Sequence, residues 1–369
     1  MPDRMPVPES LSTQAEVPGI ALARTWGDEA PRYWRNWMNA PDDELEHRFA
    51  GVMGRPHHYI ALSGGGPFGA FGAGIMCGWT EKGDRPEFTI VTGISAGGLA
   101  APFVFLGSDY DDELREIFTS YSTKDLIRPR NIFSLLWSDA AADSRPLRKL
   151  IATYLDDAAL RAIAAEHRKG RRLFIGTTNL DAERSVLWNI GEIADSAAPG
   201  ALELVHSIML ATASIPGAFP PVMIPVEADE QSFDEIHVDG GTTSTVFVYP
   251  TAMNWEEVKD RLDVPGRPAL YLIQNFFVDP RWREIEPQII PIASYAMYTL
   301  IRNQGIGDIH RVFALAQRDG LDFNLVHIPA DFDEKPDEIF DPEFMQKLYD
   351  VGYGLGRNGV AWEKTPPGY

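Results

Sequence analysis

A serine between two glycines is the residue of this sequence best placed for nucleophilic chemistry. Ser95 lies in Gly93-Ile94-Ser95-Ala96-Gly97, which matches the Gly-x-Ser-x-Gly pattern. In that pattern a sharp turn between a strand and a helix exposes the hydroxyl, and the flanking glycines remove side chains that would collide. A small residue in an ordinary tight turn gives the same letters, because glycines are common at strand-to-helix corners. The spacing therefore nominates Ser95 as a nucleophile without deciding its role.

A second glycine-rich stretch precedes this serine and offers backbone N–H donors. Gly64-Gly65-Gly66-Pro67-Phe68-Gly69 follows the apolar run Tyr59–Leu62 and opens a helical stretch. Acyl transfer through a serine needs preorganised donors for an oxyanion, and glycines at a helix N-terminus present them. The letters also match the dinucleotide fingerprint, which requires an acidic residue about 20 positions further on. The serine motif stands there instead, so we favour an oxyanion loop over a nucleotide site.

The best candidate for a base is an aspartate. Asp239 lies in Val238-Asp239-Gly240-Gly241, at the carboxyl end of a predicted strand, and the two glycines let another backbone come close. A free aspartate, with a pKa near ~3.9, is a weak base, but burial beside apolar side chains would raise that pKa. Of the eight histidines, only His310 and His327 follow this acid in the order of a hydrolase triad. Both fall inside predicted regular elements rather than loops, so we favour Asp239.

Strands and helices alternate around these motifs. Strands are predicted at 59–62, 88–91, 171–179, 185–190, 235–241, 269–278 and 323–330, and helices at 69–83, 98–106, 111–121, twice between 145 and 168, and at 201–214, 292–317 and 341–359. Alternation of this kind is typical of a mostly parallel sheet with helices on both faces. We therefore expect an α/β fold with three layers, α/β/α.

Composition narrows the classes of partner. The chain has 369 residues, with 33 Lys and Arg against 53 Asp and Glu, giving a net charge of −20. Nucleic acid and anionic lipid surfaces are therefore repelled on average. Cys77 is the only cysteine, which excludes an internal disulfide framework and a cysteine-built zinc site, and its predicted role is core filling. We expect no metal and no cofactor.

Two uncharged windows, 59–80 and 88–108, have the length of a membrane span. Glycines interrupt both, so each is better described as a buried strand, a turn and a buried helix. The N-terminus lacks the apolar region of a secretory signal. We expect a cytoplasmic protein on the chain as given, or a cell-envelope or secreted protein if a leader was omitted.

Taken in order, GGGPFG, GISAG and DGG resemble the motifs of the patatin-like phospholipases, in particular bacterial-type members. The segments TTNLDAERSVLWNIGEIA (177–194) and ATASIPGAFPPV (211–222) also look like parts of a patatin domain, and the resemblance runs roughly from Tyr59 to Phe247. It implies a modified α/β-hydrolase fold with Ser95 as nucleophile and Asp239 as its base. The implied oxyanion hole is Gly64, Gly65 and Gly66, with the amides of the last two as donors, and the other motif glycines are Gly69, Gly93, Gly97, Gly240 and Gly241.

One departure from that family concerns the glycine loop. Many members carry an arginine at its fourth or fifth position, where this sequence has Pro67 and Phe68. The backbone donors are unaffected by this difference. A charge that could meet a phosphate is absent, so phospholipid preference is less secure than ester hydrolysis.

The resemblance implies a lipid acyl hydrolase of phospholipase A or esterase type that works through an acyl-serine intermediate. A Ser-His-Asp esterase or acyltransferase stays open as an alternative, as does an inactive lipid-binding or scaffold protein. The expected partner is a lipid or acyl-ester substrate, with peripheral membrane contact as an option and no nucleic acid. We expect an irregular N-terminal arm (1–55), a catalytic core (56–250) and a C-terminal α/β extension of the same domain (251–369).

Overall fold

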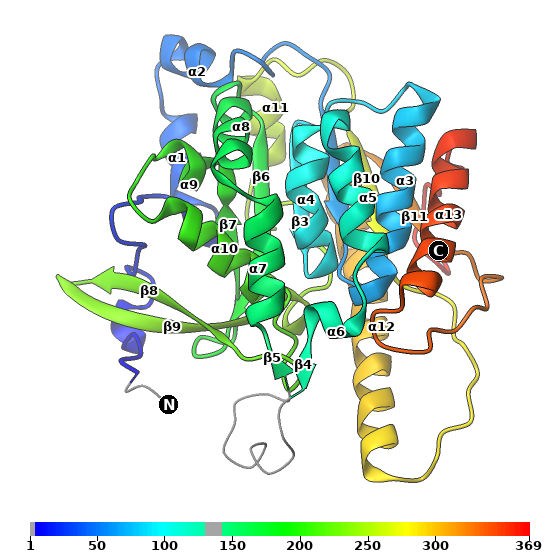
Figure 1. Cartoon of the computed structure of the whole chain (residues 1–369). Helices are drawn as coiled ribbons and strands as arrows, with labels where there is room; N and C mark the ends of the chain where they lie inside the picture. Colours follow the sequence, from blue (N-terminus) through cyan, green and yellow to red (C-terminus); the bar gives the residue numbers. More distant parts are fainter. Residues whose placement is uncertain (1–3, 130–141) are drawn as a thin grey trace.

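The computed structural model describes residues 4–129 and 142–369, and within these ranges a mixed nine-stranded sheet forms the centre (Figure 1). The strand order is β1-β7-β6-β3-β2-β10-β11, with β9 also paired to β6 and β8 paired to β9. The strands are β1 (Arg24–Trp26), β2 (His58–Leu62), β3 (Ile90–Ile94), β6 (Arg172–Asn179), β7 (Arg184–Asn189), β8 (Val222–Ala228), β9 (Gln231–Asp239), β10 (Ala269–Gln274) and β11 (Asp322–His327). A separate short pair joins β4 (Arg128–Pro129) to β5 (Ala142–Asp143).

The five strands β6, β3, β2, β10 and β11 are parallel neighbours, and the remaining pairs are antiparallel. Their register brings the carboxyl ends together, because Leu62 pairs with both Gly93 and Ile273, and Ile94 pairs with Gly176. In open α/β sheets, ligands bind outside the carboxyl ends of the strands. The glycine loop and Ser95 both follow strands that end at this edge.

Helices cover both faces of the sheet. They are α1 (Arg32–Met38), α2 (Asp42–Phe49), α3 (Gly69–Lys82), α4 (Ala96–Leu106), α5 (Asp111–Thr119), α6 (Thr123–Leu126), α7 (Arg145–Tyr154), α8 (Asp157–Arg168), α9 (Ile190–Asp195), α10 (Ala201–Thr212), α11 (Trp255–Arg261), α12 (Ile289–Arg318) and α13 (Pro342–Asn358). Short 3₁₀ turns are η1 (Glu9–Leu11), η2 (Gly66–Phe68), η3 (Ser108–Tyr110) and η5 (Gly240–Thr242).

The alternation of side chains along the strands creates two separate cores. On β2, Ile60 and Leu62 pack with α3, α4 and α13, whereas Tyr59 and Ala61 pack on the opposite face with α1, α11 and α12. Successive side chains of a strand point to opposite faces, so a central strand that is apolar throughout serves both cores. The fold is therefore a three-layer α/β/α arrangement with a mostly parallel central sheet, as the sequence predicts.

The two uncharged windows form a strand, a turn and a helix, as predicted: β2, η2 and α3 in the first, and β3 and α4 in the second. The second strand is displaced from its predicted position, because β3 begins at Ile90 and runs through Gly93 to Ile94, directly before Ser95. Cys77 is buried in α3, as expected. Among the described residues, no helix is long and apolar enough to cross a bilayer.

Two antiparallel additions to the sheet are not anticipated from the sequence. Strand β8 has strictly alternating burial and forms a hairpin with β9, turning at Asp229 and Glu230, which both have positive φ. Near this hairpin, β1 from the N-terminal arm pairs with the outer side of β7, and Arg24 makes a buried ion pair with Glu235 of β9. The arm therefore belongs to the sheet rather than only packing onto it.

Candidate active site

Ser95 occupies the sharp turn between β3 and α4. Its backbone has φ +54° and ψ −125°, an unfavourable conformation for a residue with a side chain. The N–H of Ser95 donates to Thr212 Oγ1 at 2.9 Å. A Cβ on Gly97 would lie 2.2 Å from the carbonyl oxygen of Leu62, so only glycine allows the first turn of α4 to approach β2 this closely. This is the strained elbow that the Gly-x-Ser-x-Gly pattern predicts.

Asp239 reaches the serine because β9 runs antiparallel to β6 and ends at the carboxyl edge of the parallel strands. It pairs with Thr177, the residue after Gly176, and Gly176 pairs with Ile94. The register therefore places Asp239 beside the turn that follows β3. The Ser95 hydroxyl donates to Asp239 Oδ2 at 2.7 Å, and the N–H of Gly241 donates to Oδ1 at 2.7 Å.

Both members of this pair are withdrawn from solvent, with 7% of Ser95 and 5% of Asp239 exposed. Burial raises the pKa of Asp239 to about 7, against smaller lowering effects from the hydrogen bonds of Ser95 and Gly241. A carboxylate in a low-dielectric site is a stronger base than a solvated one. With this pKa, Asp239 can both accept and return a proton near neutral pH.

The glycine loop lies against the serine. A Cβ on Gly64 would lie 3.1 Å from the Cβ of Ser95. The N–H of Gly64 donates to the carbonyl of Thr245 at 3.0 Å, so Gly64 contributes to the loop but offers no free donor. Within the described residues, the N–H groups of Gly65 and Gly66 have no hydrogen-bond partner. These two amides are the available donors of the loop.

Asn275, just beyond β10, holds this loop in place. Its Nδ2 donates to the carbonyl of Ser63 at 2.9 Å, and its Oδ1 accepts from the N–H of Gly72 at 3.0 Å. A Cβ on Gly65 would lie 2.2 Å from the carbonyl oxygen of Asn275. Sequence reasoning misses Asn275 and Thr212 as site residues, although Thr212 lies in one of the segments that resemble a patatin domain.

The remaining motif glycines are where backbones or rings come into close contact. An added Cβ would lie 2.3 to 2.5 Å from a neighbouring atom at Gly69 at the start of α3, Gly93 in β3 and Gly240 in η5, closer than real Cβ atoms come. At Gly241, also in η5, it would lie 3.0 Å from the carboxylate of Asp239, which is a tight contact. The three sequence motifs thus meet at one place in the fold.

An apolar pocket opens beside the serine hydroxyl. It has a volume of about 60 Å³. Its walls come from the glycine loop, α4 to α7, the segment after α10 and the start of α13; among the lining residues are Pro67, Ser95, Leu99, Phe118, Leu147 and Ile215. Phe68 packs instead against Phe276, Phe277 and Phe344, with ring centroids 5.6 to 5.7 Å apart. The pocket offers hydrocarbon walls to a group that is bonded to Ser95.

A wider groove of about 400 Å³ adjoins this pocket, and the two share Tyr121 and Leu150. Three cations line it, namely Lys124, Arg128 and Lys149, together with one carboxylate, Asp125. None of the three cations has an ion-pair partner among the residues that the structure describes. A concentration of free positive charge is notable in a chain with a net charge of −20.

All histidines lie in the described residues, and none of them forms a hydrogen bond with Ser95 or Asp239. His237, two residues before the aspartate, has its ring nitrogens on Thr177 Oγ1 and Glu235. His327 Nε2 lies 3.1 Å from the carboxylate of Glu363. Across residues 4–129 and 142–369, no cluster of His, Cys, Asp or Glu could hold a metal ion.

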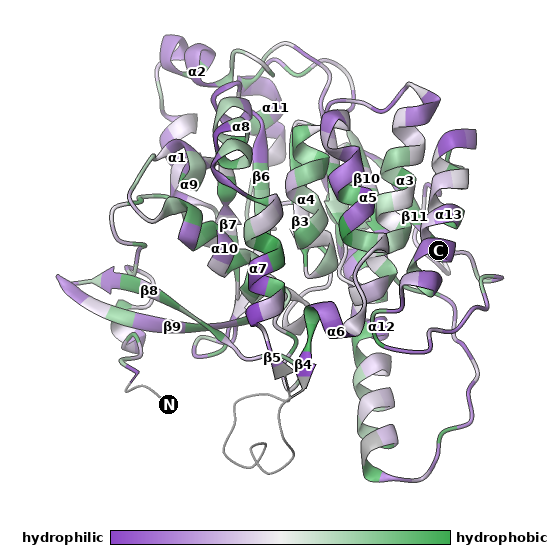
Figure 2. Cartoon of the chain, in the orientation of Figure 1, coloured by the Kyte–Doolittle hydropathy of each residue, from purple (hydrophilic) through white to green (hydrophobic). Residues whose placement is uncertain are grey.

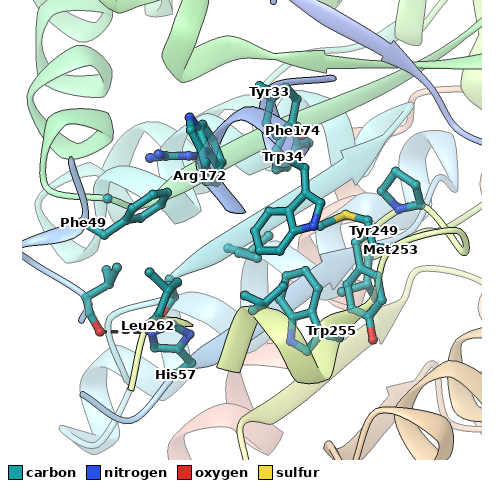
Figure 3. A pocket seen from close by; sticks show the side chains of 18 of the residues that line it. Tyr33, Trp34, Phe49, His57, Arg172, Phe174, Tyr249, Met253, Trp255 and Leu262 are labelled. Carbon is teal, nitrogen blue, oxygen red and sulfur yellow. Dashed lines mark hydrogen bonds between the residues drawn. The ribbon is translucent and has the colours of Figure 1, made fainter. Parts of the chain in front are cut away.

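A second apolar cavity, of about 50 Å³, lies on the other face of the sheet (Figure 3). Aromatic rings from the N-terminal arm and α11 line it, and the Arg172 guanidinium lies 4.7 Å from the ring centroids of both Trp37 and Phe49. Burial lowers the pKa of Arg172 to about 10. Ser95, Asp239 and the glycine loop contribute nothing to its walls, so this cavity is separate from the candidate active site.

Comparison with known proteins identifies the family of this chain. The family model described as "Patatin-like phospholipase" matches residues 60–252, more than half of the chain. Among solved structures, VipD from Legionella pneumophila is similar at 12% identity with a TM-score of 0.42, covering 82% of this chain and 66% of that one. No curated protein matches. By the extent of the family match, the chain belongs to the patatin-like phospholipases, a family of lipid acyl hydrolases.

Proposed function

We propose that this protein hydrolyses carboxylic esters of lipids through an acyl-serine intermediate, with Ser95 as nucleophile and Asp239 as its sole base. The observation that supports this most directly is the 2.7 Å hydrogen bond from the Ser95 hydroxyl to the buried Asp239 carboxylate. The same carboxylate has no histidine within hydrogen-bond distance. A dyad needs nothing else to accept the serine proton.

In the first step, Ser95 Oγ attacks the ester carbonyl while its proton passes to Asp239 Oδ2. The carbonyl oxygen becomes an oxyanion, which the N–H groups of Gly65 and Gly66 stabilise, because donors fixed in a dry site need no reorganisation. Collapse of the tetrahedral intermediate breaks the bond to the alcohol. Asp239 returns its proton to the departing alkoxide, leaving an acyl-serine and a neutral alcohol.

In the second step, a water molecule gives one proton to Asp239 and attacks the acyl carbonyl. The second tetrahedral intermediate collapses, Ser95 Oγ leaves, and Asp239 returns the proton to it. The products are the free fatty acid and the starting enzyme. During both steps the acyl chain lies along the apolar pocket walls formed by Leu99, Phe118 and Leu147. No metal takes part.

The cationic groove supports a phospholipase role within this chemistry. The loop lacks the arginine that many relatives carry there, but Lys124, Arg128 and Lys149 provide positive charge from α6, β4 and α7 instead. Because the groove shares Tyr121 and Leu150 with the pocket, one substrate can have its acyl chain in the pocket and a phosphate in the groove.

The test is hydrolysis of a soluble short-chain p-nitrophenyl ester by wild type, Ser95→Ala and Asp239→Asn. Both variants should lose activity by several orders of magnitude, while Ser207→Ala, which alters an exposed hydroxyl on α10, should retain it. A fluorophosphonate probe should label the wild-type peptide that contains Ser95. Near-normal kcat in Asp239→Asn would refute the dyad.

The histidine alternative is tested in the same assay. His310→Gln and His327→Gln should each stay within about tenfold of wild type, whereas loss of a triad base costs several orders of magnitude. Collapse of activity in either variant, with the fold intact by circular dichroism, would assign the chemistry to a Ser-His-Asp esterase.

A further inference from the structure

Helix α12 is much longer than the sheet that it covers. Its 30 residues span about 45 Å. The strands that precede and follow it in the chain, β10 and β11, have six residues each and span roughly 20 Å. The C-terminal half packs on the sheet through buried Ile309, Val312 and Phe313. Among described side chains, none between Ile289 and Gln304 is buried. The N-terminal half therefore extends beyond the sheet.

This extension lies at the same edge of the sheet as Ser95. Because β10 is parallel to β3 and α12 follows β10, the helix begins beyond the carboxyl edge and runs back along the sheet to β11. Figure 1 shows the first half of α12 projecting past the body, at the end of the molecule where α6 lies. Leu126 of α6 lines the pocket beside Ser95.

The projecting helix has two different sides. Toward the body, Tyr298 packs on Phe276 with ring centroids 5.1 Å apart, and Arg302 donates to the carbonyl of Val278. On the other side, residues spaced by three and four positions form an exposed apolar stripe. The stripe of α12 consists of Ile289, Ile292, Ala293, Ala296, Met297 and Leu300.

The exposure of this stripe is extreme for apolar side chains, with 86% of Ile289 and 66% of Leu300 accessible. From Pro287 to Ile301 the sequence has no charged residue, although 23% of the whole chain is charged. Figure 2 shows the projecting part of α12 coloured mostly white to green. Contiguous exposed apolar surface of this kind marks an interaction site.

The charge pattern favours a lipid surface as the occupant. The protein has a net charge of −20, and the projecting first half of α12 has no charged residue from Ile289 to Ile301, which suits hydrocarbon and neutral head groups. The preceding segment places Trp282, 90% exposed, between Arg281 and Arg283. Tryptophan and arginine are suited to the boundary between hydrocarbon and water. Because no described helix can span a bilayer, α12 would lie on the surface rather than cross it.

Two sets of contacts fix the helix to the catalytic machinery. Buried Asp308 accepts hydrogen bonds from the N–H and hydroxyl of Thr245 at 2.6 and 2.9 Å. The carbonyl of Thr245 in turn accepts a hydrogen bond from the N–H of Gly64. Phe276, which contacts Tyr298, also packs on Phe68 of the glycine loop, 5.7 Å away. When α12 binds to a lipid surface, these contacts therefore keep the glycine loop and Ser95 at a fixed position relative to that surface.

We propose that the apolar stripe of α12 docks on the surface of an uncharged lipid aggregate and thereby holds the mouth of the Ser95 pocket at that surface. The proposal rests on the lipid hydrolase function proposed above and adds how the enzyme reaches substrate that is not dissolved. Docking and chemistry use different residues, so they can be tested separately.

The experiment measures co-sedimentation with zwitterionic phosphatidylcholine vesicles, using Ser95→Ala protein so that the vesicles stay intact. The stripe variant adds Ile292→Glu and Leu300→Glu, which place two charges where hydrocarbon is expected. The matched control adds Asn36→Glu and Ala158→Glu, the same two charges at exposed positions of α1 and α8. We expect binding of the stripe variant to weaken at least tenfold and binding of the control to stay within twofold.

The same substitutions in the active enzyme give a second readout. The stripe variant should hydrolyse vesicle lipid at least tenfold more slowly and a soluble short-chain ester within twofold of wild type. Failure of wild type to cleave the soluble ester would refute the proposed function, while vesicle binding by the Ser95→Ala protein would still decide the docking proposal.

Three outcomes would overturn the docking proposal. The first is no vesicle binding by the parent protein, and the second is equal binding by the stripe variant. The third is a dimer, measured by sedimentation velocity without lipid, that the stripe substitutions dissociate, since a second copy would then cover the stripe. Circular dichroism of each variant checks that the overall helix content is unchanged.

Discussion

The hydroxyl of Thr212 ties the backbone of Ser95 to the neighbouring strand. It accepts from the N–H of Ser95 at 2.9 Å and donates to the carbonyl of Gly176 at 2.6 Å, so one side chain satisfies two buried backbone groups. Because Ser95 has a strained backbone, the turn depends on contacts of this kind to keep its conformation. Thr212 is a positioning residue that acts through the backbone of Ser95.

Thr212→Val should therefore impair catalysis without touching substrate. Valine has nearly the same shape but removes the acceptor of the Ser95 N–H and the hydroxyl that donates to the carbonyl of Gly176. A buried group left unsatisfied costs about 1–3 kcal/mol. We expect kcat on a soluble ester to fall at least tenfold with little change in KM. Thr212→Ser keeps the hydroxyl and should restore most of the activity. Equal loss in both variants would argue for a packing role instead.

The pH dependence of the reaction should follow Asp239. The carboxylate must be ionised to accept the serine proton, and burial raises its pKa to about 7, so kcat/KM should rise with pH and level off above about 7. The measurement is kcat/KM on a soluble ester between pH 5 and 9. His327→Gln should leave the midpoint of this rise in kcat/KM unchanged. A midpoint near pH 4 would mean that the carboxylate of Asp239 is solvated in the working enzyme.

The titration of Asp239 should lower folding stability as pH rises, the opposite of its effect on kcat/KM. A carboxyl whose pKa is raised in the folded protein favours folding while it is protonated, and this contribution is lost as pH rises from about 4 through about 7. Ionised Asp239 then costs on the order of a few kcal/mol. Asp239→Asn removes that cost, so its Tm should exceed that of wild type by more at pH 8 than at pH 5. A difference independent of pH would contradict the raised pKa.

The cationic groove should affect phosphate-bearing substrates selectively. Lys124→Gln combined with Lys149→Gln removes two of the three positive charges of the groove and leaves the apolar pocket unchanged. We expect KM for a monomeric short-chain phosphatidylglycerol to rise about five- to tenfold, because ion pairs with a phosphate are lost. KM for the matching uncharged diacylglycerol should not change. Replacing Lys82 and Lys335, exposed lysines that line neither the pocket nor the groove, with glutamine is the control, and an equal effect there would indicate long-range charge alone.

The sequence contains most of what is needed to locate the site, because its chemistry rests on local glycine motifs. The turn at Ser95 and the strand end at Asp239 are visible as short patterns of residues. The supports from Thr212 and Asn275 are not, since each depends on contact with a segment far away in the chain. The sequence also cannot show that the N–H of Gly64 is hydrogen-bonded, because its partner is Thr245, 181 positions later.

Prediction of the fold from the sequence has a similar limit. Central strands and their helices have strong apolar patterns, and these elements lie at or within a few residues of their predicted positions, as β3 does. The hairpin of β8 and β9 is missed because two of the exposed positions of β8 carry Met223 and Pro225, which disguise its alternation. The apolar periodicity of α12 identifies a long helix but cannot say that only its second half has a sheet to cover, since that depends on the length of the strands beside it.

Strand β1 has a consequence for solubility that concerns the first 26 residues. It occupies the outer side of β7, which would otherwise present a row of unpaired N–H and C=O groups. Open strand edges of this kind recruit strands from other molecules. A protein trimmed to begin after Trp26 would keep the glycine loop and every residue of the dyad yet expose this edge, and would lose Arg24, the arginine that pairs with Glu235. The N-terminal segment thus acts as a built-in guard against aggregation for a catalytic unit that lies elsewhere in the chain.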